Sequence, residues 1–327
     1  MDNRPTVLLI YGGKGYERDV SVAGMENLLP KIDENRYRVL PLFIEPDGRW
    51  VMYEKEALLV RGGIITDGEF TKIDCAFPLL HGDFGEDGRV QGALDCACIK
   101  YIGCDTVTSA LCRDKYIVKA VAKSLEIPTL PCILAIKGED LDTVVSETRE
   151  KFGYPVFVKP TSLGSSIGAS TASSNEELIS ALLTAFSVSD RVIIEKCLSP
   201  KRELECGYFK AKGKEVFTKC GEILCEGFYS YHKKYSSPEV KTRAVADVGE
   251  EISLKIQEYS RRLVRALGIR DIARIDFFLS GEDIYFNEIN TMPGQTKASL
   301  YAQMLAAAGV PENEFPNMLI EECLTRG

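Results

Sequence analysis

Short aliphatic runs separated by glycine-rich and polar segments dominate the first third of the chain. Residues 7–11 form an apolar run that ends at Gly12-Gly13, which predicts a buried strand followed by a tight loop. A helical period follows at 21–31, and further apolar runs lie at 38–44 and 75–80. Because strands alternate with helices, we expect an N-terminal α/β domain, residues 1–105, built on a parallel sheet.

The middle of the chain, residues 106–195, has the pattern of a small central α+β domain. A helix is expected at 109–124, and strands are expected at 154–159 and 192–195. Ser174-Asn175-Glu176-Glu177 has the form of a capping box, which predicts a helix that starts there and runs to about residue 186.

Longer strand-like runs characterise residues 196–327, which we expect to form a C-terminal α+β domain. These runs lie at 203–209, 215–220, 273–278 and 284–287. Asp247 and Glu250 have capping-box spacing and predict the start of an amphipathic helix that ends near residue 267.

Composition and charge narrow the class of protein. The 327 residues include 40 Lys and Arg against 48 Asp and Glu, a formal net charge of 40 − 48 = −8. The hydrophobic share of 45% and the charged share of 27% are those of an ordinary globular protein and exclude disordered and collagen-like chains. Net acidity argues against a nucleic-acid partner, because nucleic-acid affinity comes mainly from neutralised phosphates. A bound polyanion should therefore be small.

Cysteine usage indicates a reducing compartment. The eleven cysteines are odd in number, contain no C-x-x-C pair, and have only His81 and His232 to complete a mixed metal site. Reduced thiols are the expected state. The apolar run near the N-terminus is too short for a signal peptide or a membrane span, so we expect a cytoplasmic protein with no membrane partner.

Polar residues interrupt two apolar runs near the C-terminal end. Arg274 and Asp276 lie two apart in one run, and Glu288 and Asn290 lie two apart at the end of the next. Residues two apart in a strand share a face, so adjacent strands would bring an arginine, two carboxylates and an amide together. Such oxygen ligands suit Mg²⁺ that is also bound to phosphate. The alternative is a surface ladder of charges, which the flanking apolar residues disfavour.

Weaker signals of ligand binding lie elsewhere. Lys159 ends a predicted strand and precedes the small-residue loop 160–168, which offers N–H groups to a phosphate or is simply a turn. Glu195 and Glu203 flank a junction suited to a flat base and a ribose, with solvated charge as the alternative. Glu17 follows the first strand, where it would meet a substrate ammonium or complement a helix dipole.

Together these segments resemble the ATP-grasp superfamily and, within it, the D-alanine:D-alanine ligases and their vancomycin-resistance relatives. The resemblance runs from Val7 to about Ala308. The blocks that carry it are GG-x-x-x-E-x-x-VS (12–21), LLHGDFGEDGRVQG (79–92), SALCRDK (109–115), VKPTSLGSSIG (158–168), EKCL (195–198), YSYHKKY (229–235), ARIDFF (273–278) and NEINTMPG (287–294).

The resemblance implies a full set of nucleotide and metal ligands. The implied ATP ligands are Lys115, Lys159, Ser166 and the rest of loop 164–168 for the phosphates, Glu195 and Leu198 for the adenine, and Glu203 for the ribose. The implied ligands of two Mg²⁺ ions, which Mn²⁺ can replace, are Asp276, Glu288 and Asn290.

Substrate residues follow from the same resemblance. Those implied to be catalytic are Glu17, Ser165 and Tyr235, as a network around the ammonium of the first D-alanine, and Arg274 at the tetrahedral centre. Those implied to bind carboxylates are His81 for the first amino acid, and Lys234 and Ser299 for the second. The segment 229–239 matches the family's lid loop, and a homodimer is the family's usual state.

The implied activity is the ATP-dependent joining of two D-alanines through D-alanyl phosphate for peptidoglycan. Tyr235 favours D-alanine over D-lactate as the acceptor. Gln295 and Lys297 depart from the family pattern near the second-substrate pocket, so D-serine remains an alternative acceptor. A catalytically inactive, nucleotide-binding regulatory protein is the alternative outside enzymes.

Overall fold

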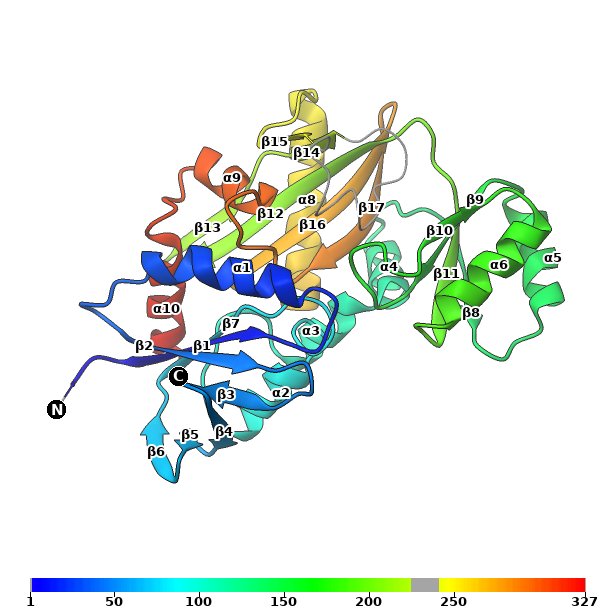
Figure 1. Ribbon diagram of the computed structural model, residues 1–327. Helices are drawn as coiled ribbons and strands as arrows, with labels where there is room; N and C mark the ends of the chain where they lie inside the picture. The colour runs from blue at the N-terminus through cyan, green and yellow to red at the C-terminus, as the bar shows by residue number, and fades with distance from the viewer. Residues whose placement is uncertain (1, 225–240, 327) are drawn as a thin grey trace.

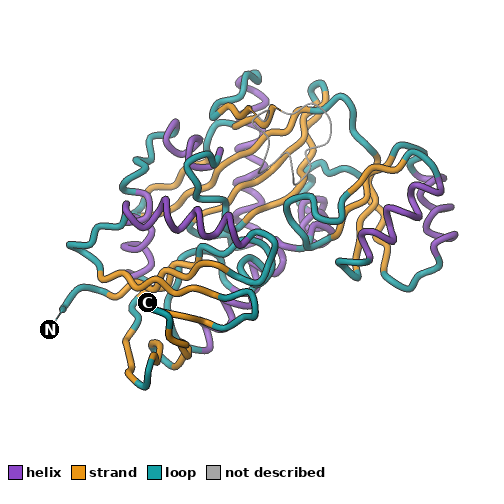
Figure 2. Tube along the Cα trace, viewed as in Figure 1, coloured by secondary structure: helices purple, strands orange, loops and turns teal. Residues whose placement is uncertain are grey.

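The computed structural model describes residues 2–224 and 241–326, and in these ranges the chain forms three β-sheets with helices packed around them (Figure 1). A seven-stranded sheet lies near the N-terminus, a four-stranded sheet in the middle of the chain and a six-stranded sheet towards the C-terminus. The four-stranded sheet projects to one side, while the other two sheets lie next to each other (Figure 2). Within the described ranges, no helix is both long enough and apolar enough to cross a membrane.

The N-terminal part of the chain combines the seven-stranded sheet with two helices. In chain order its elements are β1 (Thr6–Gly12), α1 (Arg18–Leu28), the 3-10 turn η1 (Leu29–Lys31), β2 (Arg38–Ile44), β3 (Trp50–Met52), β4 (Lys55–Val60), β5 (Gly63–Thr66), β6 (Glu69–Lys72), β7 (Cys75–Pro78) and α2 (Arg89–Cys96).

The predicted parallel sheet is present at β2, β1 and β7. β1 lies between the other two strands and is parallel to both. Its alternate residues enter two different cores, Val7 and Leu9 on one face and Leu8 and Ile10 on the other. Burial on both faces explains why this strand is a continuous apolar run.

The remaining strands extend the same sheet in an antiparallel manner. β2 through β6 pair in chain order, and each pairing is antiparallel. Connections of two to five residues join them, and such short turns can link only antiparallel neighbours. The expected parallel sheet is thus one end of a mixed sheet.

The central part of the chain consists of two short helices followed by the four-stranded antiparallel sheet and its covering helices. Its elements are α3 (Thr106–Arg113), α4 (Lys115–Ser124), β8 (Cys132–Ile136), α5 (Leu141–Lys151), β9 (Val156–Pro160), β10 (Ser170–Ala172), α6 (Asn175–Phe186) and β11 (Arg191–Lys196).

The single helix expected at 109–124 is divided at Asp114. This residue is extended, and its carboxylate accepts hydrogen bonds from the N–H groups of Tyr116 (2.9 Å) and Ile117 (3.1 Å). Asp114 therefore ends α3 and caps α4. The break places Lys115 in the first turn of α4, beside the loop that follows β9.

The C-terminal part of the chain contains the six-stranded sheet, in the order β15-β14-β12-β16-β17 with β13 paired to β12. Its elements are β12 (Arg202–Ala211), β13 (Lys214–Phe217), β14 (Gly221–Leu224), β15 (Lys241–Arg243), α8 (Glu250–Leu267), β16 (Ile272–Ser280), β17 (Asp283–Asn290), α9 (Leu300–Ala307) and α10 (Phe315–Thr325).

Alternation along β12 and β16 separates an apolar face from a charged one. Leu204, Ile275 and Phe277 pack in a core together with Ile256 and Leu263 of α8. The residues between them in sequence point away from this core. The helix α8 has the predicted extent, but the expected cap at Asp247 is wrong, because Gly249 occupies the N-cap position without a side-chain hydrogen bond.

The predicted cap of α6 at Ser174 is confirmed, while the return bond of the capping box goes to the residue before the cap. Ser174 Oγ accepts a hydrogen bond from the N–H of Glu177 (3.2 Å), and Glu177 Oε2 accepts one from the N–H of Ser173 (2.7 Å). The N–H of Glu177 would otherwise be unpaired at the helix start.

We therefore expect Ser174→Ala to loosen the first turn of α6. Loss of the cap should cost about 1 kcal/mol, which accelerates hydrogen–deuterium exchange of the α6 amides about fivefold. The control is Ser180→Ala in the exposed middle of the same helix, where alanine is the better helix former and exchange should not accelerate. Equal acceleration in both variants would contradict the assigned cap.

Candidate functional site

A cleft opens between the central and C-terminal sheets. It is lined by the end of β9 and the loop after it, by the start of α4, and by one face of β12, β16 and β17. The predicted site residues that it brings together are Lys115, Lys159, Ser165, Ser166, Glu203, Arg274, Asp276 and Glu288. Asn290 lines a smaller adjoining pocket with Lys115, Gly164 and Glu288.

The register of β16 and β17 aligns the predicted metal ligands. Asp276 pairs with Glu288, and Arg274 pairs with Asn290. Because Ile275 lies in the core, its neighbours Arg274 and Asp276 both face the cleft, as the sequence pattern predicts.

Each carboxylate of this pair has a cation beside it. Asp276 accepts hydrogen bonds from Arg274 Nε (2.8 Å) and Nη2 (2.7 Å) and from Asn290 Nδ2 (3.1 Å). Glu288 Oε2 lies 3.1 Å from Lys115 Nζ.

The donor set fits a hard divalent cation. Two carboxylates and an amide offer the oxygen ligands that Mg²⁺ takes alongside phosphate oxygens and water. Among the described residues, no group of three or more His, Cys, Asp and Glu side chains gathers as a metal cluster. A cation here would complete its coordination with water or with oxygens of a bound phosphate.

Two lysines and a loop of small residues make the phosphate side of the cleft. Lys115 Nζ donates a hydrogen bond to the carbonyl of Leu163 (2.8 Å), at the start of this loop. Burial lowers the pKa of Lys115, and Glu288 opposes that effect. Ser165 and Ser166 both have left-handed backbone conformations, with φ of 54° and 59°. Successive backbone turns of this kind aim N–H groups at a common point, which suits an anion.

Lys159 is fixed by two acceptors. Its Nζ donates a hydrogen bond to Asn287 Oδ1 (2.9 Å) on β17 and lies 2.8 Å from Glu195 Oε2 on β11. It therefore links the central sheet to the C-terminal sheet across the floor of the cleft.

The side chain of Glu195 is buried in the central part of the chain. It is only 2% exposed and forms ion pairs with Lys119 and Lys159. Burial alone would raise the pKa of Glu195, but the ammonium groups of Lys119 and Lys159 outweigh burial and lower it to about 2. Any contact between Glu195 and a base would therefore use its backbone. Lys119, which the sequence interpretation missed, lies one helical turn after Lys115 on the same face of α4.

The other two predicted nucleotide ligands lie near the start of β12. Leu198 is half-buried in the connection between β11 and β12. Glu203 lines the cleft, with its Oε1 2.9 Å from Lys201 Nζ.

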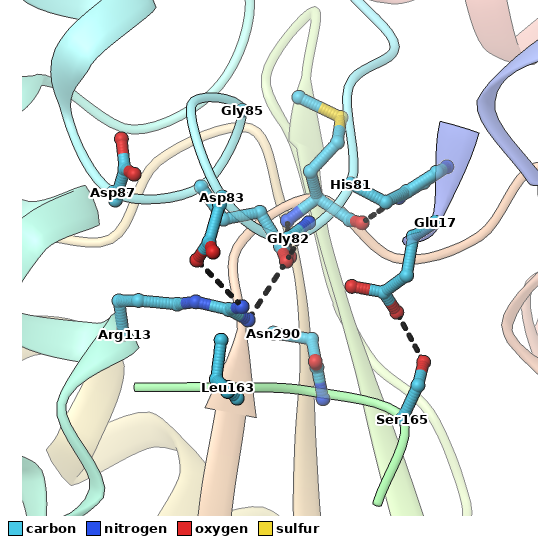
Figure 3. Close-up of polar contacts among 12 residues, drawn as sticks. Glu17, His81, Gly82, Asp83, Gly85, Asp87, Arg113, Leu163, Ser165 and Asn290 are labelled. Carbon is cyan, nitrogen blue, oxygen red and sulfur yellow. Dashed lines mark hydrogen bonds and ion pairs between the residues drawn. The ribbon is translucent and has the colours of Figure 1, made fainter. Parts of the chain in front are cut away.

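Glu17 faces the phosphate-side loop from the start of α1. Ser165 Oγ donates a hydrogen bond to Glu17 Oε1 (Figure 3). Glu17 occupies the N-cap position of α1, yet its side chain makes no cap hydrogen bond there. The carboxylate is thus directed at Ser165, which favours a ligand role over a helix-capping role.

His81 lies behind Glu17 with a defined ring orientation. Its Nδ1 is 2.9 Å from the carbonyl oxygen of Met292, so Nδ1 carries the proton and donates it. Its Nε2 is buried and has no hydrogen-bond partner among the described residues. This buried ring nitrogen is therefore a candidate contact for a bound molecule: when protonated it donates to a carboxylate, and when unprotonated it accepts from an N–H or O–H group.

A buried ionic cluster that the sequence interpretation missed supports this corner. Arg113 lies 3.4 Å from Asp83 Oδ1 (Figure 3). It also lies 3.4 Å from Glu86 Oε2. Glu86 also accepts hydrogen bonds from the N–H groups of Gly82 (2.8 Å) and Met292 (3.3 Å). Glu86 lies in the middle of the sequence block 79–92, which resembles the ligase family. Its place in that block was the signal from which a role at the site could have been predicted.

Only some of the residues predicted to bind the second substrate lie in the part of the chain that the structure describes. Ser299 precedes α9, and its Oγ contacts the N–H (3.0 Å) and Oγ1 (2.9 Å) of Thr296. Gln295 is buried and donates a hydrogen bond to the carbonyl of Pro293 (3.0 Å), so its polar amide is satisfied within its own loop. Lys234, Tyr235 and the segment 229–239 lie outside the described residues.

We expect Glu195→Gln to destabilise the central sheet strongly. The variant leaves two buried ammonium groups without their shared carboxylate, which should cost about 3–5 kcal/mol in opening free energy at pH 7. The folded pKa of about 2 lies below the ordinary value of 4.5, so the stabilisation is complete above pH 4.5 and is lost towards pH 2.

Hydrogen exchange of the β11 amides across this pH range measures the effect. The difference between wild type and variant should shrink on acidification. Glu215→Gln is the control, because its carboxylate is 48% exposed beside Lys210 and its loss should change stability by less than about 1 kcal/mol. A difference that stays constant with pH would refute the assigned ion pairs.

Comparison with known proteins provides evidence that is independent of the site geometry. Two family models match the chain, one described as D-ala D-ala ligase C-terminus over residues 121–321 and one described as D-ala D-ala ligase N-terminus over residues 6–64 and 61–104.

Relatives are similar over nearly their whole length. A D-alanine–D-alanine ligase of Chlorobium phaeovibrioides is 35% identical and covers 98% of this chain and 97% of its own length. A D-alanine–D-alanine ligase of Deinococcus radiodurans is also 35% identical, over 97% of this chain and 98% of its own.

Solved structures agree with the fold. The D-alanyl-alanine synthetase A of Vibrio cholerae superimposes with a TM-score of 0.91 at 29% identity, covering 100% of both chains. The VanG D-Ala:D-Ser ligase of Enterococcus faecalis gives 0.89 at 27% identity, over 98% of this chain and 99% of that one. The predicted ATP-grasp α/β fold is thereby confirmed. By its sequence over almost its full length, the chain belongs to the D-alanine–D-alanine ligase family.

Proposed function

We propose that this protein is an ATP-dependent ligase that joins two D-alanines through a D-alanyl phosphate intermediate, making D-alanyl-D-alanine for peptidoglycan. The observation that carries the proposal is the charged row of β16 and β17, where Arg274, Asp276 and Glu288 face a cleft that also holds Lys115 and Lys159. Full-length similarity to D-alanine–D-alanine ligases supports the same activity.

The charges of the cleft suit phosphoryl transfer to a carboxylate. A carboxylate does not react with an amine at pH 7, because its carbon is electron-rich and oxide is a very poor leaving group. Conversion to an acyl phosphate removes this obstacle. Lys115 and Lys159 would neutralise phosphate charge, and the loop 164–168 would add backbone N–H donors. Glu203 would take the ribose.

Two Mg²⁺ ions, or Mn²⁺ in their place, are part of the proposal. Asp276, Glu288 and Asn290 would hold them, and the ions would supply neutralisation of the phosphate oxygens during transfer. The oxygen donor set described above supports this assignment.

The corner around Glu17 would bind the first amino acid. Its carboxylate would accept the substrate ammonium, with Ser165 holding it in place. His81 Nε2 would lie near the substrate carboxylate. Arg274 would then stabilise the oxyanion that forms when the amine of the second D-alanine attacks the acyl phosphate.

The arrangement of the chain is a further part of the proposal. Each sheet corresponds to one unit, 1–105, 106–195 and 196–327, with the nucleotide between the second and third. We also propose a homodimer, and a cytoplasmic location because ATP is the phosphoryl donor.

The direct test is a coupled phosphate-release assay with the purified protein, D-alanine, ATP and Mg²⁺. We expect phosphate release that depends on D-alanine, together with formation of D-alanyl-D-alanine. Turnover only when D-serine is added would instead assign the D-alanine:D-serine activity. No turnover with any acceptor, combined with ATP binding, would assign a regulatory protein.

Glu288→Gln should abolish ligation while leaving the fold intact. The variant removes one negative metal ligand, so we expect kcat to fall at least about 100-fold with an unchanged circular dichroism spectrum. Glu282→Gln, an exposed change at the turn of the same hairpin, should retain full activity. Full activity of Glu288→Gln would exclude its role as a metal ligand.

A further inference from the structure

A third carboxylate stands in the same cross-strand row as Asp276 and Glu288. Glu205 on β12 pairs with Asp276 on β16, which in turn pairs with Glu288 on β17. Glu205 is 4% exposed and lines the same cleft. Like charges directly opposite each other in a sheet repel, so this row requires cations to hold it together.

Arg274 is the cation between two of these carboxylates. Its Nε lies 3.2 Å from Glu205 Oε1 and 2.8 Å from Asp276 Oδ1, and its Nη2 lies 2.7 Å from Asp276 Oδ2. The guanidinium side chain is only 14% exposed. Its orientation is therefore set by Glu205 on one strand and Asp276 on its own strand.

Asp276 has two roles that compete. As the partner of Arg274 it uses both carboxylate oxygens, and as a metal ligand it must offer oxygen to a divalent cation. A guanidinium and a dication on one carboxylate repel each other at short range. A metal ion on Asp276 would therefore weaken the hold of Asp276 on Arg274, and Arg274 would depend more on its second carboxylate, Glu205, to keep its place in the cleft.

We infer that Glu205 is the positioning residue that holds Arg274 in the cleft when Asp276 coordinates the metal. Glu205 acts through Arg274 and does not bind the metal itself. The part of this inference that concerns ligation rests on the proposed function, whereas the part that concerns metal binding does not.

Metal binding tests the inference without any turnover. In Glu205→Gln, Arg274 has only Asp276 as its carboxylate and competes with the cation there. Mn²⁺ is added alone, and its binding is followed by electron paramagnetic resonance. We expect the gain in Mn²⁺ affinity caused by Arg274→Met to be at least about fivefold larger in the Glu205→Gln background than in the wild-type background. Simple long-range charge effects add and therefore cancel in this double-mutant cycle.

A different outcome of the same double-mutant cycle would overturn the inference. If Glu205→Gln weakens Mn²⁺ binding by the same factor with and without Arg274, then Glu205 either binds the metal directly or has no link to Arg274, and the inference is overturned. The cycle is informative even if the protein joins no amino acids.

Ligation supplies a second measurement. We expect Glu205→Gln to lower kcat about tenfold with KM for ATP changed less than about threefold, because positioning of Arg274 acts on the chemical step. Glu222→Gln is a matched control. Glu222 is also buried and binds an arginine, Arg202, at 2.7 and 2.9 Å, but it lies opposite Leu204, on the core face of the same sheet.

Glu222→Gln should keep the wild-type kcat despite a comparable loss of an ion pair. Equal falls of kcat in the two variants would mean that any damage to this sheet slows the enzyme, and would contradict a specific role for Glu205. An inactive wild type with the expected Mn²⁺ cycle would reject the proposed ligation and leave the Glu205–Arg274 relation established.

Discussion

Pairing of buried charges is the constraint on which the cleft depends. Lys115 is held by Glu288, Lys159 by Glu195, and Arg274 by Asp276 and Glu205. An ion buried without a partner costs several kcal/mol, so these side chains stay charged and ordered only as pairs. Each cleft cation that would meet a phosphate or an oxyanion is thus kept in place by a carboxylate before a substrate arrives.

The sheets make this arrangement available. In β12 and β16, one set of alternate residues packs against α8, and the other set carries the charges of the cleft. The register then brings strands distant in sequence into one row, so that Glu205 and Glu288 flank Asp276. Packing of the apolar face against α8 fixes the strands in place. The charged side chains on the opposite face of the same strands are therefore attached to a rigid backbone.

Much of this architecture is visible in the sequence, because apolar periodicity reports which residues are buried. The helix from Asn175 and the shared face of Arg274 and Asp276 follow from local spacing alone. The break at Asp114 was missed because its cap competes with an otherwise continuous helical pattern. The ion pairs were missed for a different reason. Lys119 and Glu195 are 76 residues apart, and no local pattern connects them.

One feature of the fold bears on how the protein is made. The inner face of β1, with Val7 and Leu9, shares its core with Leu319 and Ile320 of α10. A ribosome therefore releases the first strand some 300 residues before the helix that covers it. During synthesis α1 can cover part of this face early, whereas the part that α10 covers stays exposed until the end of the chain has emerged.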